Sequence, residues 1–516
     1  MLMRDRNGDL NTAHLIGDIG RRATRGGTVM LGAQVVKLVA QFGSVIVLAR
    51  VLAPAEFGLI AMVGAMTALF EIVKELGLSA ATMQKTDITH EQVSALFWIN
   101  TGAGCLIAAC LALGAPAIAR FYGQPDLEAV TRWLALGFVM SGATVQHWAL
   151  LRRQMRFSAI AIAETGSELM AFVVAVVLAF QGWGHWALVA QRLAAPLLVM
   201  TGCWLLCRWR PSLPRRTPGI PELLGFGLSV SGCGILATLA RSIDQILVGR
   251  LFGAATLGLY ERAARLVLVP INSINAPLYS VAMPALSRLV DEPQRFRRAF
   301  GVLIERVAMV TMPAAAGAAV ASDWVTNLLF GPKWEAMSPL ITCFALVAAV
   351  QPTLMTAGLI YLPQGRSRDL LRSTAIDVAL AIASFVAGIP YGAVGVAGAY
   401  AAIGLVIRLP VCFYLAAGQG PVTQRDLYLR ITPSVVASLA VAGVVWILRN
   451  GVMPESLLAA PLVALAVAAV VGMLTAGVAF LLMRPSREAM TSVVRSLFTR
   501  HPPQPVTTTF AEEVAE

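Results

Sequence analysis

Runs of about 20 apolar residues, separated by short polar stretches, recur along this sequence and constrain its fold more than any other feature. A helix of about 20 residues spans the roughly 30 Å hydrocarbon core of a membrane. Lipid offers the backbone no hydrogen-bonding partners, which forces such runs into helices. The composition agrees, because only 13% of the residues are charged, against about 25% in soluble proteins. The sequence therefore predicts an all-α, polytopic membrane protein.

The apolar runs predict about fourteen transmembrane helices. Their expected ranges are 28–52, 55–77, 93–118, 129–150, 159–181, 185–207, 222–248, 254–280, 302–321, 337–361, 370–390, 393–417, 430–449 and 457–483. Pro270 and Pro277 interrupt the eighth range, so we expect a kinked helix there with these two prolines as candidate hinges.

The basic residues orient these helices. Cytoplasmic loops of membrane proteins carry the excess of lysine and arginine. With both termini placed in the cytoplasm, roughly 27 of the 40 basic residues fall on the inner side and about 8 on the outer side. The arginines gather in alternate segments, such as 152–156, 208–216, 288–306, 366–372 and 484–500. We therefore expect an inner-membrane protein with both ends in the cytoplasm.

A repeat suggests that the chain consists of two similar halves. ARVLAPAEFGLIA at 49–61 aligns without gaps with GRLFGAATLGLYE at 249–261, so that Gly58 corresponds to Gly258. Each segment follows the first helix of its half, which gives the halves the same orientation in the membrane.

The expected domains follow from this repeat and from the polar linkers. They are a cytoplasmic segment at 1–27, a first lobe at 28–207, a cytoplasmic linker at 208–221, a second lobe at 222–417, two further helices at 430–483, and a cytoplasmic amphipathic segment with a disordered tail at 484–516.

Four of the basic residues within expected helices come from four different helices spread over both halves, and a charge in the middle of a span costs roughly 2.5–3.5 kcal/mol on insertion scales. They are Lys37, Arg192, Arg241 and Arg408. Such charges persist where they face one another, an acid or a watery cavity. A cavity between the halves could collect them into a cationic chamber. That chamber would bind a diphosphate or an acidic sugar, since arginine and lysine match phosphate oxygens. Pairing with a neighbouring acid is the alternative for each.

Acidic residues in or near the expected helices have two interpretations. They are Asp244, Glu168, Asp377 and Glu71. Each could bind a coupling proton or cation, or could pair with a basic neighbour, as Arg241 with Asp244 on one helix face. Glu71 lies near a helix end, where it could instead reach the membrane surface.

Several classes of function lack the residues they require. The five histidines form no helical pair that would bind zinc, so we expect no metal and no cofactor. The loops expected outside are short, which disfavours an enzyme with a water-exposed active site. The net charge of +12 is spread over many loops, and we therefore expect no nucleic-acid partner.

Three stretches resemble the lipopolysaccharide and exopolysaccharide flippases, a branch of the multidrug/oligosaccharidyl-lipid/polysaccharide exporter superfamily. They are LARVLAPAEFGLIAM at 48–62, ELGLSAATMQ at 75–84 and the segment 242–289. The resemblance implies two six-helix lobes around a central cavity, two added C-terminal helices and alternating access. It also implies an undecaprenyl-diphosphate-linked oligosaccharide as the substrate, membrane lipids as surroundings, and polysaccharide polymerase or export machinery as candidate partners.

The sequence is also compatible with other functions. A multidrug exporter of the same superfamily would prefer an acidic cavity, whereas the charges at mid-depth here are mostly basic. A peptidoglycan-precursor exporter would move the same lipid diphosphate with a different sugar. From another class, a membrane-embedded polysaccharide polymerase or transferase would need a large outer loop or an intramembrane histidine.

Overall fold

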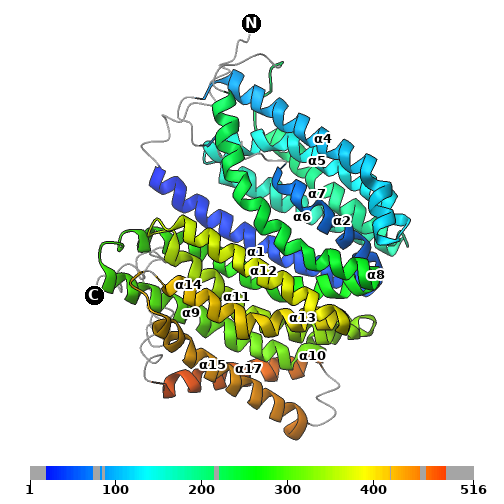
Figure 1. The fold of residues 1–516 in the computed structure, drawn as a ribbon. Coiled ribbons are helices and arrows are strands. Elements are labelled where there is room, and N and C mark those ends of the chain that lie inside the picture. The colour runs from blue at the N-terminus through cyan, green and yellow to red at the C-terminus, as the bar shows by residue number, and fades with distance from the viewer. Residues whose placement is uncertain are drawn as a thin grey trace. The chain divides into compact units, whose positions relative to one another are not determined.

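The computed structural model describes residues 19–73, 79, 82–83, 88–213, 220–418, 420–453 and 461–483. Within those residues the regular structure is helical and contains no strand. The chain divides into two compact units, Met1–Gly258 and Leu259–Glu516. Figure 1 shows the helices of each unit as a bundle.

Unit 1 is a bundle of antiparallel helix pairs. Its helices are α1 (Ile19–Val51), α2 (Pro54–Val73), α4 (His90–Tyr122), α5 (Asp126–Arg153), α6 (Phe157–Phe180), α7 (His185–Leu206) and the first part of α8 (Ile220–Ser287). α4 packs along α5, α6 packs along α7, and α1 lies against α6. Thr89 starts α4 with a reciprocal capping box to Gln92, which satisfies two backbone donors that the first helical turn leaves unpaired.

Unit 2 begins within α8 and contains the remaining helices. They are α9 (Pro293–Val320), α10 (Ser322–Leu329), α11 (Ser338–Tyr361), α12 (Ser367–Gly388), α13 (Gly392–Ile403), α14 (Leu409–Ala417), α15 (Gln424–Ile447) and α17 (Pro461–Leu482). A π-helical stretch at Gly404–Arg408 joins α13 to α14. α9 packs along both α11 and α15, and α15 packs along α17.

The all-α, membrane-spanning fold predicted from the sequence is confirmed. Ten helical segments of the described residues are long and apolar enough to cross a membrane, and each of the expected ranges overlaps a helix. The number fourteen stays a prediction, as do the domain boundaries. α10 was not expected, because its 8 residues are too few to produce the apolar run that marks a span.

The seventh and eighth expected ranges are separated at a single glycine. Gly253 has φ 82° and ψ 176°, whereas the backbone of α8 on either side is helical. Side chains disfavour a positive φ of this kind, which glycine adopts without a steric penalty. The chain can therefore turn here without an extended loop.

The two glycines matched by the repeat meet inside unit 1. A Cβ atom at Gly58 would overlap the carbonyl oxygen of Ala254, and a Cβ atom at Gly258 would overlap the carbonyl oxygen of Pro54. The contact is reciprocal, because Pro54 and Ala254 are also matched in the repeat. The first turns of these two segments approach closely because neither matched position has a side chain.

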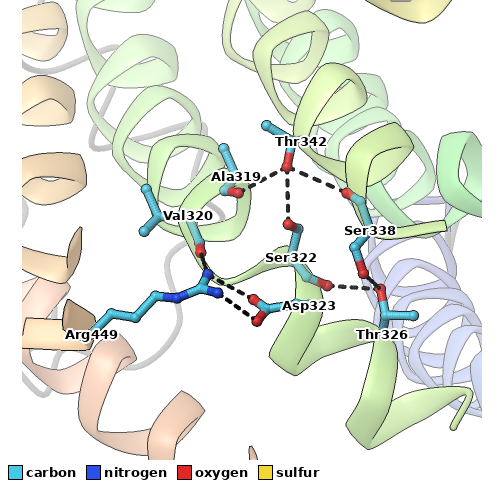
Figure 2. A network of polar contacts seen from close by, with 8 residues as sticks. All are labelled: Ala319, Val320, Ser322, Asp323, Thr326, Ser338, Thr342 and Arg449. Carbon is cyan, nitrogen blue, oxygen red and sulfur yellow. Dashed lines mark hydrogen bonds and ion pairs between the residues drawn. The ribbon is translucent and has the colours of Figure 1, made fainter. Parts of the chain in front are cut away.

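A polar network joins the C-terminal end of α9 and the short α10 to the π-helical turn Leu448–Val452, which follows α15 (Figure 2). Arg449 donates to both carboxylate oxygens of Asp323, at 3.0 and 2.8 Å, and to the carbonyl oxygen of Val320 at 3.0 Å. Thr342 on α11 donates to Ser322 at 2.9 Å. The network thus joins α10, α11 and the turn after α15 within unit 2.

Candidate functional site

Lys37 lies on α1 and is held against α6. Its ammonium nitrogen is 3.5 Å from Oε2 of Glu164, and the two side chains are 30% and 26% exposed. A distance of 3.5 Å is at the outer limit for a hydrogen bond. Lys37 is therefore neutralised by a nearby acid, but its ammonium is only weakly committed to that acid.

Glu164 is positioned by a second donor. The indole N–H of Trp148 on α5 donates to Oε1 of Glu164 at 2.9 Å. The guanidinium carbon of Arg152 lies 3.7 Å from the centre of the Trp148 ring, a cation–π contact. The position of the carboxylate thus depends on three helices, α1, α5 and α6.

The ion pair of Arg408 in unit 2 is much closer than that of Lys37 in unit 1. The Nε and Nη2 atoms of Arg408 donate to the two oxygens of Asp377 on α12, each at 2.8 Å. Two parallel bonds of this kind are the strongest geometry for an arginine and a carboxylate. The side chain of Arg408 is 8% exposed, and its guanidinium lies 4.6 Å from the centre of the Tyr400 ring.

The backbone at Arg408 is irregular. The residue closes the π-helical stretch Gly404–Arg408, and insertions of this kind are frequent at functional sites. Asp377 is 37% exposed, so the acid of this pair is more accessible than the base. The pair forms one site on the helices α12 to α14.

The other predicted site residues lie apart from these two pairs. Arg192 is exposed on α7, next to Gln191, which donates to Ser44 on α1 at 2.8 Å. Glu168 is half-buried on α6, one turn beyond Glu164, and Glu71 is exposed near the end of α2.

Four further residues fall on α8. The side chain of Arg241 lies outside the described residues, and Asp244 is half-buried. Pro270 and Pro277 both lie within the helical backbone of the part of α8 that follows Gly253. Their roles, as a cation of the chamber, its paired acid and two hinges, stay predictions.

A buried ion pair that was not predicted joins α9 to α15. Arg430 donates to Oε2 of Glu305 at 2.7 Å, and the side chain of Glu305 is 3% exposed. Gly301 makes room, since a Cβ atom there would lie 3.1 Å from Nε of Arg430. Glu305 falls inside an expected span, and its charge at that depth was the signal that could have drawn attention to it.

These contacts separate two kinds of intramembrane cation. Arg408 and Arg430 each donate at 2.8 Å or less to an acid from another helix, which fixes helices to one another. Lys37 retains accessible surface and a long contact to its acid, which leaves its ammonium group able to bind an anion. Unit 1 thus contains the candidate binding group.

Comparisons with known proteins place the chain in a family. A family model described as "Polysaccharide biosynthesis protein" matches residues 47–339. The chain is 28% identical over 303 residues to the teichuronic acid biosynthesis protein TuaB of Bacillus subtilis (strain 168), which covers 58% of this chain and 63% of that protein. It is 26% identical to the lipopolysaccharide biosynthesis protein WzxC of Escherichia coli (strain K12), over 59% of this chain and 62% of that protein.

A third relative, the succinoglycan biosynthesis transport protein ExoT of Rhizobium meliloti (strain 1021), is 24% identical over 59% of this chain and 62% of that protein. The chain therefore spans less than two thirds of the length of each of these relatives.

Two solved structures share the fold. An inward closed conformation of the lipid II flippase MurJ superposes with a TM-score of 0.68 at 12% identity, over 89% of this chain and 98% of that one. An inward-facing multidrug transporter of the MATE family superposes with a TM-score of 0.53 at 14% identity, over 78% of this chain and 95% of that one. The family model covers more than half of the sequence, and the chain therefore belongs to the polysaccharide biosynthesis protein family.

Proposed function

We propose that this protein is a flippase that carries an undecaprenyl-diphosphate-linked oligosaccharide, a lipopolysaccharide or exopolysaccharide repeat unit, across the bacterial inner membrane by alternating access. The observation that carries the proposal is the contact of Lys37, whose side chain is 30% exposed on a predicted membrane span and whose ammonium nitrogen is 3.5 Å from its acid. A diphosphate would compete well for such a group, because it brings more negative charge than one carboxylate.

The relatives support this substrate class. TuaB and WzxC are named for the biosynthesis of teichuronic acid and of lipopolysaccharide, and ExoT is named as a transport protein. The fold is shared with a lipid II flippase. A protein of this kind moves its cargo without chemical change, so we propose that it is not an enzyme.

Alternating access is supported by the reciprocal contact of the repeat. Gly58 and Gly258 each lie against backbone atoms of the other segment. A contact of this type can separate without leaving a side-chain charge or hydrogen-bonding group unpaired in lipid. Pro270 and Pro277 are the proposed hinges, because a proline removes one helical hydrogen bond and permits bending.

The alternation of arginine-rich segments supports an inner-membrane protein with both termini in the cytoplasm. The lobes at 28–207 and 222–417, with the linker at 208–221, stay as proposed. The cationic chamber would contain Lys37, Arg192, Arg241 and Arg408, and polysaccharide polymerase or export machinery is the proposed partner.

The experiment that tests the function is translocation of a fluorescent undecaprenyl-diphosphate oligosaccharide in proteoliposomes. The unaltered protein is compared with Lys37→Ala, Arg192→Ala, Arg241→Ala and Arg408→Ala. Lys333→Ala serves as the matched control, because Lys333 is exposed on the short 3-10 helix Pro332–Met337 and belongs to neither ion pair. We expect flipping by the unaltered protein and the control, and its loss in Lys37→Ala.

Two results would contradict the proposal. One is an unaltered protein that moves no lipid-linked oligosaccharide but exports a cationic dye, which would favour a multidrug exporter. The other is transport of a peptidoglycan precursor in preference to oligosaccharide units, which would keep the mechanism and change the cargo.

A further inference from the structure

One end of unit 2 carries an excess of exposed arginines. The segments 288–298, 366–372 and 425–426 contain eight arginines and four acids. Three of the acids form ion pairs within the chain, which are Glu292 with Arg295, Asp426 with Arg297, and Asp369 with Arg366.

Five exposed arginines remain. Arg288, Arg298, Arg368, Arg372 and Arg425 form what we term the arginine rim. Among the residues that the structure describes, none of these five side chains has a hydrogen-bond or ion-pair partner. Their charge is therefore available to a partner outside the chain.

The rim residues belong to one end of the unit. Arg297 reaches Asp426 at 2.5 Å, which joins the starts of α9 and α15. A Cβ atom at Gly420 would lie 2.9 Å from Oε1 of Gln364, which brings the loop before α12 beside the loop before α15. A buried core that includes Phe296, Tyr361 and Leu427 underlies all three segments.

Exposed apolar side chains accompany the arginines on two of the helices. On α12, Leu371 is 62% exposed and lies beside Arg368 and Arg372. On α15, Leu429 is 57% exposed and lies one turn, about 6 Å, further along the helix than Arg425. A charge at the helix end with an apolar side chain one turn deeper is typical of the boundary between headgroups and acyl chains.

Three arginines of unit 1, by contrast, donate to backbone carbonyl oxygens of their own chain. Arg153 donates to the carbonyl oxygen of Thr82, and Arg156 donates to that of Leu206, both at 2.9 Å. Arg210 donates to the carbonyl oxygens of Cys207 and Trp209. These segments and those of the rim are all expected on the cytoplasmic side, so the bias of positive charge toward that side does not by itself explain why the five rim side chains lack partners.

We propose that the arginine rim binds the phosphate groups of anionic phospholipids in the cytoplasmic leaflet. Guanidinium groups match phosphate oxygens through two parallel donors. The rim residues are exposed and spread over the turn after α8 and over α9, α12 and α15. This spread suits several lipid headgroups around the protein better than one enclosed ligand. The inference stands on these contacts and does not depend on the transported cargo.

The test measures lipid selectivity of the purified full chain. The protein is incorporated into bilayers of phosphatidylcholine and phosphatidylglycerol, and the lipids retained on the protein are quantified by mass spectrometry. The variant carries Arg368→Gln, Arg372→Gln and Arg425→Gln. We expect the preference for phosphatidylglycerol to fall roughly fivefold for each arginine replaced, and to fall with added salt.

The matched control removes the same charge elsewhere. It carries Arg120→Gln, Arg132→Gln and Arg250→Gln, three exposed arginines of unit 1 on segments expected at the outer side. An equal loss in the control would overturn the proposal, because net charge alone would then explain the result. A second variant with lysine at the three rim positions retains the charge and is expected to retain most of the preference.

A third arm separates the sources of phosphate. Phosphatidylcholine bilayers are supplied with undecaprenyl diphosphate in place of phosphatidylglycerol. If the three glutamines abolish retention of undecaprenyl diphosphate and leave that of phosphatidylglycerol unchanged, the rim is a substrate-loading site and the phospholipid proposal fails.

Discussion

The two units differ in how closely an intramembrane cation is paired with its acid. In unit 1, Lys37 lies 3.5 Å from Glu164, and both side chains are about one-quarter to one-third exposed. In unit 2, Arg408 makes two bonds of 2.8 Å to Asp377 and is 8% exposed. A point charge at a long distance is easily shared with a ligand, whereas a bidentate guanidinium is fixed by its geometry. The difference supports the proposal that Lys37 contacts the substrate, and it gives Arg408 a structural role beside its proposed place in the chamber.

The largest expected effect is on the folding of unit 2. Arg408→Ala removes both bonds and leaves Asp377 without its partner inside the bundle. We expect a loss of about 3 kcal/mol in the free energy of unfolding. This value is the lower end of the range for breaking a buried ion pair, because Asp377 retains some exposure. Thermal unfolding of the purified protein checks this. The double variant Asp377→Asn with Arg408→Gln should recover part of the loss, and an unchanged unfolding curve in Arg408→Ala would refute the contrast.

Lys37→Ala should have the reverse profile. Its exposed, long contact is worth at most about 1 kcal/mol to stability. We expect translocation to fall roughly ten- to a hundred-fold, corresponding to about 1.5–3 kcal/mol for a hydrogen bond between charged groups. Initial rates in proteoliposomes measure this. A variant that unfolds at lower temperature while it flips normally would show that Lys37 is structural.

Glu164→Gln tests whether the acid competes with the cargo for Lys37. Removal of the carboxylate charge frees the ammonium, so binding of the lipid diphosphate should tighten by roughly fivefold, equivalent to about 1 kcal/mol for a partly exposed pair. Equilibrium binding of the fluorescent substrate, at low and high salt, provides the measurement. Weaker binding would mean that Glu164 positions Lys37 and does not compete with the substrate.

The smallest effect is expected at Trp148. Trp148→Phe keeps an aromatic ring beneath Arg152 but removes the indole N–H that donates to Glu164. We expect a change of about twofold in translocation, near the low end of about 0.5 kcal/mol for one hydrogen bond. Trp204→Phe is the control, since its indole N–H donates to the carbonyl oxygen of Ala143 and not to the acid. A tenfold change in Trp148→Phe would place this donor among the essential groups.

Sequence alone predicted the depth of these charges but not their partners. Lys37 and Arg408 were recognisable because a charge inside an apolar run is costly. Glu164 is 127 residues from Lys37, and no spacing rule connects positions so far apart. For Asp377 the sequence allowed either a coupling ion or a basic partner, and the structure shows an ion pair with Arg408. Hydrophobic runs predicted the helices well, because lipid imposes one length and one backbone geometry.

α15 and the π-helical turn Leu448–Val452 that follows it are joined to the rest of unit 2 by three ion pairs. Asp426 pairs with Arg297, Arg430 with Glu305, and Arg449 with Asp323. A topology reporter fused directly after α14 would discard three of these six groups and leave the Glu305 carboxylate, 3% exposed, without its counterion. Reporter fusions, affinity tags and truncated expression variants should therefore be placed beyond α17. Otherwise, they would measure the behaviour of a damaged second unit.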